Sequence, residues 1–469
     1  MTYGLFHKDE KVLTVDYEPD TNRFGKILEV NNESHIPVGL ENIEGCSLSQ
    51  AVQFWWESRI LPKNRSNYKN NFLEIETLLA ASCGFNLSDQ YWIKPEDSDI
   101  CWKDYNFFRN DFNEKIGKYL IEGKTDKIRN MNSNTPDLFS NGEQDKRWVI
   151  DKGVRKLIKY GRPPYYEQPF NEMLATEICR RLNFPHVSYS ALIRGDRIFS
   201  SCPCFVDEDT EFVPAGFVQY AEKKQKGDSA FNHLISCCKK LGMSDLEKIE
   251  EGICQTVLLD YITANVDRHF GNFGFIRDAV TLEWEGLSPV FDTGNAMFFE
   301  SPTSDLRKSS SLMDNVKCKS FADTQKKQLE RFSSRISRLG IDFSRLDGIS
   351  KYYDDILSLN PKVDEERRKI LTGLLAERIE RAKEIIYSRN PVVKDFLSDI
   401  ACYSGDNFLM HMKETMFLYQ KKGEAEGKAV ENYLLSLKPK DEKELVSLIK
   451  KDIAREGRRK DRSGSGRGL

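Results

Sequence analysis

Long apolar runs, a leader sequence and paired cysteines are all missing from this sequence of 469 residues. No apolar run approaches the roughly 18 residues that a membrane span needs, and the N-terminus does not have the composition of a signal peptide. The 11 cysteines lack the paired spacing of a secreted disulfide framework, and no two Cys-x-x-Cys pairs are present to hold a structural zinc. These absences predict a cytoplasmic protein that does not interact with membranes.

An excess of charge of either sign is missing as well. The 70 Lys and Arg residues nearly balance the 73 Asp and Glu residues, so the formal net charge is -3 and gives no global electrostatic case for nucleic-acid binding. The exception is the basic, glycine-rich stretch 455–469, which we expect to be a disordered, solvated tail. Contact of this tail with nucleic acid or acidic partners is the alternative.

The signatures of ordinary eukaryotic-type kinases are absent: no Gly-x-Gly-x-x-Gly in a phosphate-loop context, no His-Arg-Asp and no Asp-Phe-Gly. In their place, Asp267 and Asn272 are five positions apart, which is the spacing of the base Asp and the metal-binding Asn in kinase catalytic loops. Asp292 follows 20 residues later and would supply a second metal-binding carboxylate. Since phosphoryl transfer needs hard oxygen ligands for magnesium and a carboxylate for the attacking hydroxyl, the pattern predicts a phosphotransferase.

Either motif alone is more typical of a turn, because Asp and Asn beside Gly favour turns. Together, the runs 265–273 and 289–292 resemble the catalytic and metal motifs of HipA-like serine/threonine kinases, and the resemblance extends over roughly residues 1–390. It implies an α+β, bilobal protein-kinase-like fold that uses ATP and Mg²⁺. It further implies that Asp267 is the base, that Asn272 and Asp292 hold magnesium, and that the acceptor is a Ser or Thr of a protein.

A hairpin is predicted by two strand-like runs, 146–150 and 154–159, around a three-residue Asp-Lys-Gly loop. Lys159 ends the second strand and is predicted to reach the nucleotide phosphates, as the strand lysine of a kinase does. Lys156 is the alternative, but it lies on the opposite face, and the sequence Leu-Ile-Lys of 157–159 matches the strand pattern of the family.

Residues 167–182 have the apolar stripe of a helix. Glu172 lies off this stripe, so a surface position is one interpretation. The resemblance favours the other, because the corresponding helix of the family opens with Asn-Glu, as at 171–172 here, and its Glu pairs with the strand Lys.

Ser140, Asn141 and Gly142 form a turn signal between two strand-like stretches. An ordinary hairpin turn is one interpretation; the resemblance places the turn over the phosphates, with its N–H groups as contacts and Ser140 as a candidate for autophosphorylation. The resemblance also places the adenine-binding hinge at 205–207, starting with Phe205.

We expect four parts in the chain. They are an N-terminal subdomain of strands and helices (1–130), a nucleotide-binding small lobe (131–214), a helical large lobe with the catalytic loop (215–390) and a helical C-terminal extension (391–469). The extension is expected to hold two or three helices, broken at 423–427 and at Pro439. The Ser-rich stretch 300–322, with serines at 309–311, is predicted to be a mobile activation or substrate-facing loop.

Two other functions stay open at this stage. The first is a kinase for a small molecule or lipid head group, because the acceptor is not encoded in the metal ligands. The second is a catalytically weak nucleotide-binding scaffold. The family resemblance also implies a toxin–antitoxin setting with a DNA-binding, antitoxin-like partner.

Overall fold

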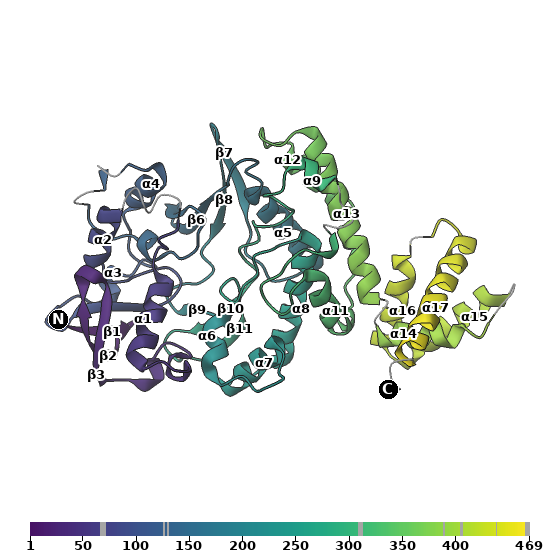
Figure 1. Cartoon of the computed structure of the whole chain (residues 1–469), viewed down its shortest axis with the longest axis horizontal. Helices are drawn as coiled ribbons and strands as arrows, with labels where there is room; N and C mark the ends of the chain where they lie inside the picture. Colours follow the sequence, from purple (N-terminus) through teal and green to yellow (C-terminus); the bar gives the residue numbers. More distant parts are fainter. Residues whose placement is uncertain are drawn as a thin grey trace.

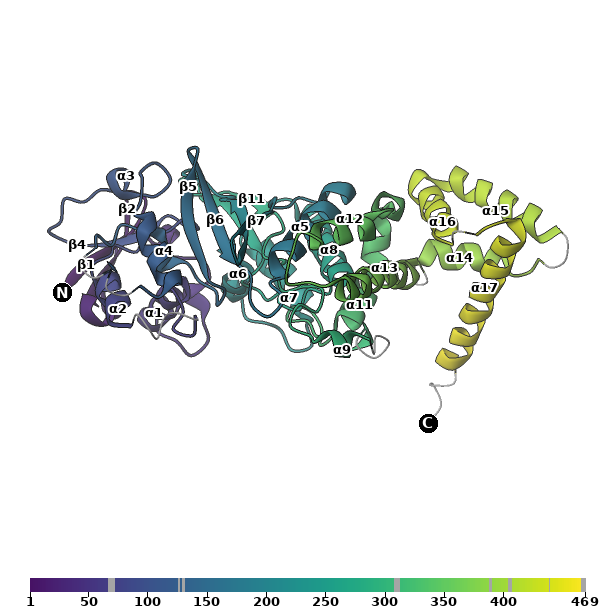
Figure 2. The same ribbon diagram turned by 90° about the horizontal axis from the view of Figure 1, so that it is seen from above.

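The computed structural model describes residues 1–65, 72–124, 127–128, 131–307, 313–387, 390–403, 407–437 and 439–464. The fold is α+β. Its described strands form separate antiparallel sheets, and helices dominate the C-terminal half (Figure 1). Seen from above, the molecule is elongated, with the N-terminal strands at one end and the last helices at the other (Figure 2). None of the described helices is both long and apolar enough to cross a membrane.

The N-terminal part is built on a four-stranded sheet of order β3-β2-β1-β4. Its strands are β1 (Thr2–His7), β2 (Glu10–Glu18), β3 (Arg23–Val30) and β4 (Tyr91–Pro95), and its longer helices are α1 (Leu48–Arg59), α2 (Phe72–Ala80) and α4 (Glu114–Glu122). Helix α1 begins at a capping box formed by Ser47 and Gln50. Its Trp55 and Trp56 are buried and anchor the helix in the core of this part.

A second sheet has the order β5-β6-β8-β7, with strands β5 (Lys146–Asp151), β6 (Val154–Tyr160), β7 (Ser190–Arg194) and β8 (Arg197–Pro203). The β5–β6 loop contains two residues, Lys152 and Gly153, and not the three that we predicted. Both have positive φ, 52° and 80°, which is the conformation of a tight hairpin turn. The shorter loop fixes the register and pairs Lys146 with Lys159 across the strands.

The predicted turn at 140–142 does not join two strands. It follows a 3-10 helix, η6 (Pro136–Phe139), whose first residue is proline, and it leads into β5. Proline fixes φ near the helical value and lacks an amide donor, so this stretch starts a helical turn and does not add a strand to the sheet. The interpretation as an ordinary hairpin turn is therefore wrong.

The central part surrounds α5 (Gln168–Leu182) and α8 (Leu246–Thr263) with further helices and one small sheet. The sheet has the order β11-β10-β9, from β9 (Thr210–Pro214), β10 (Gly274–Asp278) and β11 (Trp284–Leu287). The covering helices include α7 (Ala230–Lys240), α11 (Gln325–Arg338), α12 (Ile349–Leu357) and α13 (Glu365–Tyr387). The last eight residues of α8, 256–263, are all buried, so the end of this helix is fixed in the core and positions the loop that follows it.

Among the residues that the structure describes, four helices, and not two or three, follow α13: α14 (Pro391–Ile400), α15 (Phe408–Lys422), α16 (Glu424–Ser436) and α17 (Glu442–Gly464). Figure 1 shows them as a bundle beyond the end of α13, and their apolar residues join the central core. The predicted break occurs at Gly423, but Gly427 lies inside α16.

The stretch 455–464, which we expected to be disordered, is helical. Helix α17 continues through 455–464, a stretch rich in the good helix formers Arg and Lys, and 465–469 lie outside the described residues. The serines at 309–311 lie outside them too, while the preceding residues contain a short helix, α9 (Thr303–Leu306).

Candidate active site

A buried ion pair joins the second sheet to helix α5. Lys159 Nζ, on β6, lies 2.5 Å from Glu172 Oε1, and both side chains are buried. The surface interpretation of Glu172 is therefore wrong, because this carboxylate is enclosed although it lies off the apolar stripe of its helix. Lys156 faces the other way and pairs with exposed Asp151 at the hairpin end.

Lys159 also reaches a segment 133 residues away in sequence. Its Nζ lies 2.6 Å from Asp292 Oδ1, so one ammonium group contacts the carboxylates of both α5 and the loop after β11. Asp292 has a left-handed backbone with φ of 53°, which costs free energy for a residue other than glycine. The surrounding contacts thus hold Asp292 in a conformation that its own backbone disfavours.

Burial and mutual attraction together determine the charge states of Lys159, Glu172 and Asp292. Burial disfavours the Lys159 ammonium, but the Asp292 and Glu172 carboxylates outweigh it and hold the pKa of Lys159 well above its usual range. Burial also opposes the Asp292 carboxylate, yet Lys159 and Lys146 hold the pKa of Asp292 below its usual range. Burial raises the pKa of Glu172, against the attraction of Lys159. Lys159 is therefore charged, and Asp292 is ionised, at neutral pH.

Arg268 fastens the loop after α8 to the loop that carries Asp292. Its Nη1 donates to the carbonyls of Asn272 and Phe291, at 2.5 and 2.7 Å. Its other nitrogens donate to both carboxylate oxygens of Asp260, in the last turn of α8, at 3.0 and 3.1 Å. One buried guanidinium thus brings Asn272 beside the residue that precedes Asp292. The sequence analysis assigned no role to Arg268.

Asp267 lies on the same loop, and its carboxylate is about one-quarter exposed. Its Oδ2 accepts a hydrogen bond from Asn295 Nδ2 at 2.8 Å, and its Oδ1 lies 2.6 Å from Lys319 Nζ. The side chain of Asn272 donates to the Asp267 carbonyl at 2.9 Å. The spacing of five residues therefore corresponds to a closed loop in which the Asn272 side chain meets the Asp267 backbone.

Asn272 and Asp292 each offer a side-chain oxygen that suits a magnesium ion. Among the described residues, no protein donor bonds to Asn272 Oδ1 or to Asp292 Oδ2, while the other polar atom of each side chain is engaged. These are hard oxygen ligands of the kind that Mg²⁺ prefers. Arg268 donates to the carbonyls of Asn272 and Phe291, so the backbones that carry the two predicted ligands lie close together.

The carbonyl groups of the segment 140–142 accept hydrogen bonds from two basic side chains. Arg65 donates to the carbonyls of Ser140 and Gly142, and Lys146 Nζ donates to the Asn141 carbonyl at 2.6 Å. Ser140 itself is buried. The loop therefore lies directly over Lys146, which is the cross-strand partner of Lys159.

The sequence analysis missed Lys146. The signal for it was the hairpin, because a two-residue loop places Lys146 opposite Lys159 and so on the same face of the sheet. Burial lowers the pKa of Lys146 to about 7, and the charges of Arg65 and Lys159 act in the same direction against the attraction of Asp292.

A pH-dependent affinity for nucleotide is expected from Lys146. Its amine is mostly neutral above pH 7, and an added phosphate would raise its pKa, so binding takes up a proton and weakens as pH rises. We expect the affinity for MgATP to fall about tenfold per pH unit above pH 7, as linkage requires. Calorimetric titration at pH 7.5 and 8.5 measures this slope. Lys146→Met should bind more weakly with a flat profile, and an equal slope in both proteins would contradict the expectation.

Phe205, in the connection between β8 and β9, packs against the Asp292 loop. Its ring stacks on Phe291 with centroids 5.1 Å apart and meets Phe212 edge-on at 5.6 Å. The predicted hinge residue thus contacts Phe291, the residue next to Asp292. It lies in the segment that links β8 of the second sheet to β9 of the small sheet.

Two other polar groupings lie apart from these residues. Possible metal-binding atoms of Glu222, His233 and Cys237 lie within 4.8 Å of one another, but His233 Nε2 and Cys237 Sγ both face the Gln219 carbonyl, at 2.9 and 3.5 Å. Burial raises the pKa of the Cys237 thiol to about 11, so we assign no ion to this group.

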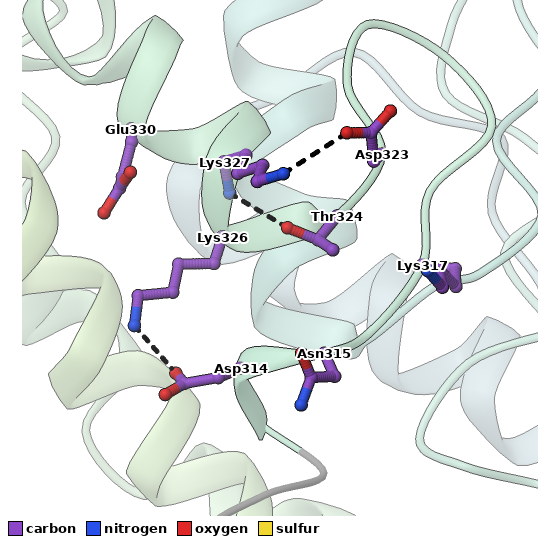
Figure 3. Close-up of a pocket in the computed structure, with 8 residues that line it drawn as sticks. All are labelled: Asp314, Asn315, Lys317, Asp323, Thr324, Lys326, Lys327 and Glu330. Atoms are coloured by element: carbon purple, nitrogen blue, oxygen red, sulfur yellow. Dashed lines mark hydrogen bonds and ion pairs between the residues drawn. The ribbon is translucent and has the colours of Figure 1, made fainter.

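The second grouping is an open cavity of about 550 Å³ at the start of α11. Charged side chains dominate its lining (Figure 3), and none of the predicted site residues contributes to it.

No protein-family model matches the chain, and no curated protein matches it. Solved structures with a similar fold include the Helicobacter pylori proinflammatory kinase CtkA, at 18% identity and a TM-score of 0.41, over 50% of this chain and 92% of that one. Another is a chain of the Shewanella oneidensis MR-1 toxin–antitoxin complex of HipA, HipB and operator DNA, at 12% identity and a TM-score of 0.47, over 82% of this chain and 99% of that one. Since both TM-scores are below 0.5, we infer function from the residues of the site and not from these neighbours.

Proposed function

We propose that this protein is a magnesium-dependent kinase that transfers the γ-phosphoryl group of ATP to a serine or threonine hydroxyl of a protein. The observation that carries the proposal is the contact of Lys159 with both Glu172 and Asp292. A lysine on a strand, braced by a helix glutamate and placed against a metal-binding carboxylate, is the arrangement that positions nucleotide phosphates in kinases.

In this proposal each residue has one task. Lys159 and Lys146 bind phosphate oxygens, and Glu172 orients Lys159. Asn272 and Asp292 hold magnesium, which neutralises charge on the phosphates when it is bound. Asp267 orients the acceptor hydroxyl and takes its proton while the new O–P bond forms and the bond between the γ-phosphorus and the bridging oxygen breaks. ADP is the leaving group.

The test is transfer of label from γ-labelled ATP by purified protein with magnesium, beside an Asp292→Ala variant. We expect label on protein serine or threonine with the wild type and none with the variant. Asp355→Ala is a suitable control, because Asp355 is exposed and pairs with Lys351 on the surface of α12. Label that persists in Asp292→Ala would overturn the assignment of the metal ligand.

The acceptor class is tested in the same assay by adding protein lysate or lipid extract in separate reactions. Label on a lipid head group but never on protein would replace the proposal by a lipid kinase. ATP binding without transfer in any of these reactions would favour a nucleotide-binding scaffold. Mapping of the labelled peptides decides whether Ser140 is an acceptor; as a buried residue it would have to become exposed first.

A further inference from the structure

Lys319 is a cation placed directly on the proposed base. Its Nζ lies 2.6 Å from Asp267 Oδ1, and its side chain is 58% exposed. We propose, on the basis of the proposed function, that Lys319 binds the transferring phosphoryl group from the acceptor side and stabilises the charge that its equatorial oxygens carry during transfer. The sequence analysis had treated this stretch only as part of a mobile, substrate-facing loop.

The backbone around Lys319 is anchored. An antiparallel bridge pairs Lys317 with Thr324, and Gln328 Oε1 accepts hydrogen bonds from Ser320 Oγ and Phe321 N, at 3.0 and 2.8 Å. The ring of Phe321 is buried within an aromatic cluster. Its neighbours in that cluster are Phe231, Phe270, Phe273 and Phe332. Lys319 is thus held next to Asp267 by a short loop that is fixed at both ends and at its centre.

The same loop is tied to the residues around the base. Gln325, the first residue of α11, donates from Nε2 to the carbonyl of Asn265 at 2.5 Å, and its Oε1 accepts from Arg378. Asn265 in turn accepts from the Asp267 amide at 3.2 Å. Hydrogen bonds through Gln325 and Asn265 therefore connect the loop of Lys319 to the loop of Asp267. A chance ion pair between exposed side chains would not need such connections.

The distribution of charge supplies a reason for this placement. Lys159 and Lys146 lie on the second sheet, on the side of Asp292, and Arg268 is engaged by Asp260. Among the described residues, Lys319 is the only cation in an ion pair with Asp267. A phosphoryl group in transfer carries charge on three equatorial oxygens between the leaving and attacking oxygens. Lys319 supplies positive charge where the acceptor meets this group, and preorganised charge of this kind accelerates transfer.

Lys319 changes partner in this step but exchanges no proton. In the structure its ammonium pairs with Asp267. When the γ-phosphoryl group is present, the ammonium donates to a phosphoryl oxygen, and Asp267 Oδ1 becomes available to the acceptor hydroxyl. Because a lysine side chain has several rotatable bonds and this one is more than half exposed, the exchange needs no movement of the anchored backbone.

The test compares Lys319→Met, Lys319→Arg and Lys317→Met in the 469-residue chain. The acceptor is the protein that receives label from γ-labelled ATP in the assay above. Lys317 is the matched control, since it lies two residues away on the same loop but lines the separate charged cavity (Figure 3). We expect Lys319→Met to lower kcat about 100-fold, the effect of removing one preorganised donor, with the Kd for MgATP changed less than twofold. Lys319→Arg should recover part of kcat, and Lys317→Met should behave as the wild type.

Thermal unfolding separates this role from a structural one, because an exposed ion pair contributes little to stability and the Tm should stay the same. An unchanged kcat in Lys319→Met would overturn the inference while leaving the proposed kinase intact. An increase in kcat would also overturn it, since Lys319 would then be blocking the base. Absence of transfer by the wild type on any acceptor would overturn the proposed function and this inference with it.

Discussion

Replacing Asp267 by Asn is expected to reduce phosphoryl transfer by about 10³-fold, within the range of a general base, and to leave MgATP binding nearly unchanged. Asparagine has the same shape as aspartate and keeps an oxygen for the hydrogen bond from Asn295. It cannot take the proton of the acceptor, and it loses the charge that attracts Lys319. The measurement is single-turnover transfer with saturating ATP, together with calorimetric titration of nucleotide.

The control for this prediction is Asp323→Asn. Asp323 is 78% exposed, it pairs with Lys327 at 3.3 Å and it lies on the loop that carries Lys319. It should keep full activity. A rate for Asp267→Asn within a factor of five of the wild type would mean that another group accepts the proton, and Asp267 would then be an orienting residue only.

The second large effect is expected for Lys159→Met, which should both abolish transfer and destabilise the fold. Without the ammonium, buried Glu172 and partly exposed Asp292 lose the cation that both contact, and breaking the buried Lys159–Glu172 pair costs about 3–5 kcal/mol. Urea unfolding measures this loss. The activity should fall at least about 100-fold, because the lysine is also the proposed phosphate ligand.

The chain offers a matched control for this variant as well. Lys156→Met changes the same residue type on the same strand, but Lys156 faces the other way and pairs with exposed Asp151, so stability should change by about 0–1 kcal/mol. The double variant Lys159→Met/Glu172→Gln separates the two effects. It removes one of the opposed carboxylates and should recover stability without recovering transfer. Recovery of transfer in the double variant would contradict the phosphate-binding role of Lys159.

The proposed site depends on two buried cations that link segments distant in sequence. Lys159 joins a strand, a helix and the loop of Asp292, whereas Arg268 joins Asp260, Asn272 and the residue before Asp292. Burying a charge is unfavourable unless it is paired and hydrogen-bonded, and both cations meet this condition. The pairs therefore define a single relative position of the two loops and the sheet, which a site for phosphoryl transfer needs.

Local patterns in the sequence determined much of this fold. The apolar stripe of 167–182 predicted α5 to within one residue, because periodicity reports directly which face of an element is buried. The two strand-like runs around Asp-Lys-Gly predicted the β5–β6 hairpin, although the loop is one residue shorter than predicted. The spacing of Asp267, Asn272 and Asp292 is likewise a property of the chain alone. It was enough to predict a class of chemistry before any contact was known.

Only the tertiary structure decided which polar side chains are buried and what they face. Glu172 lies off the apolar stripe of its helix, so its periodicity indicated the surface, yet it is buried because Lys159 meets it there. Asp292 and Lys319 reach Lys159 and Asp267 across 133 and 52 residues, and no local pattern encodes such pairs. The reason is physical: a charged group can be buried only when a distant segment supplies its partner, and the fold as a whole determines whether that segment arrives.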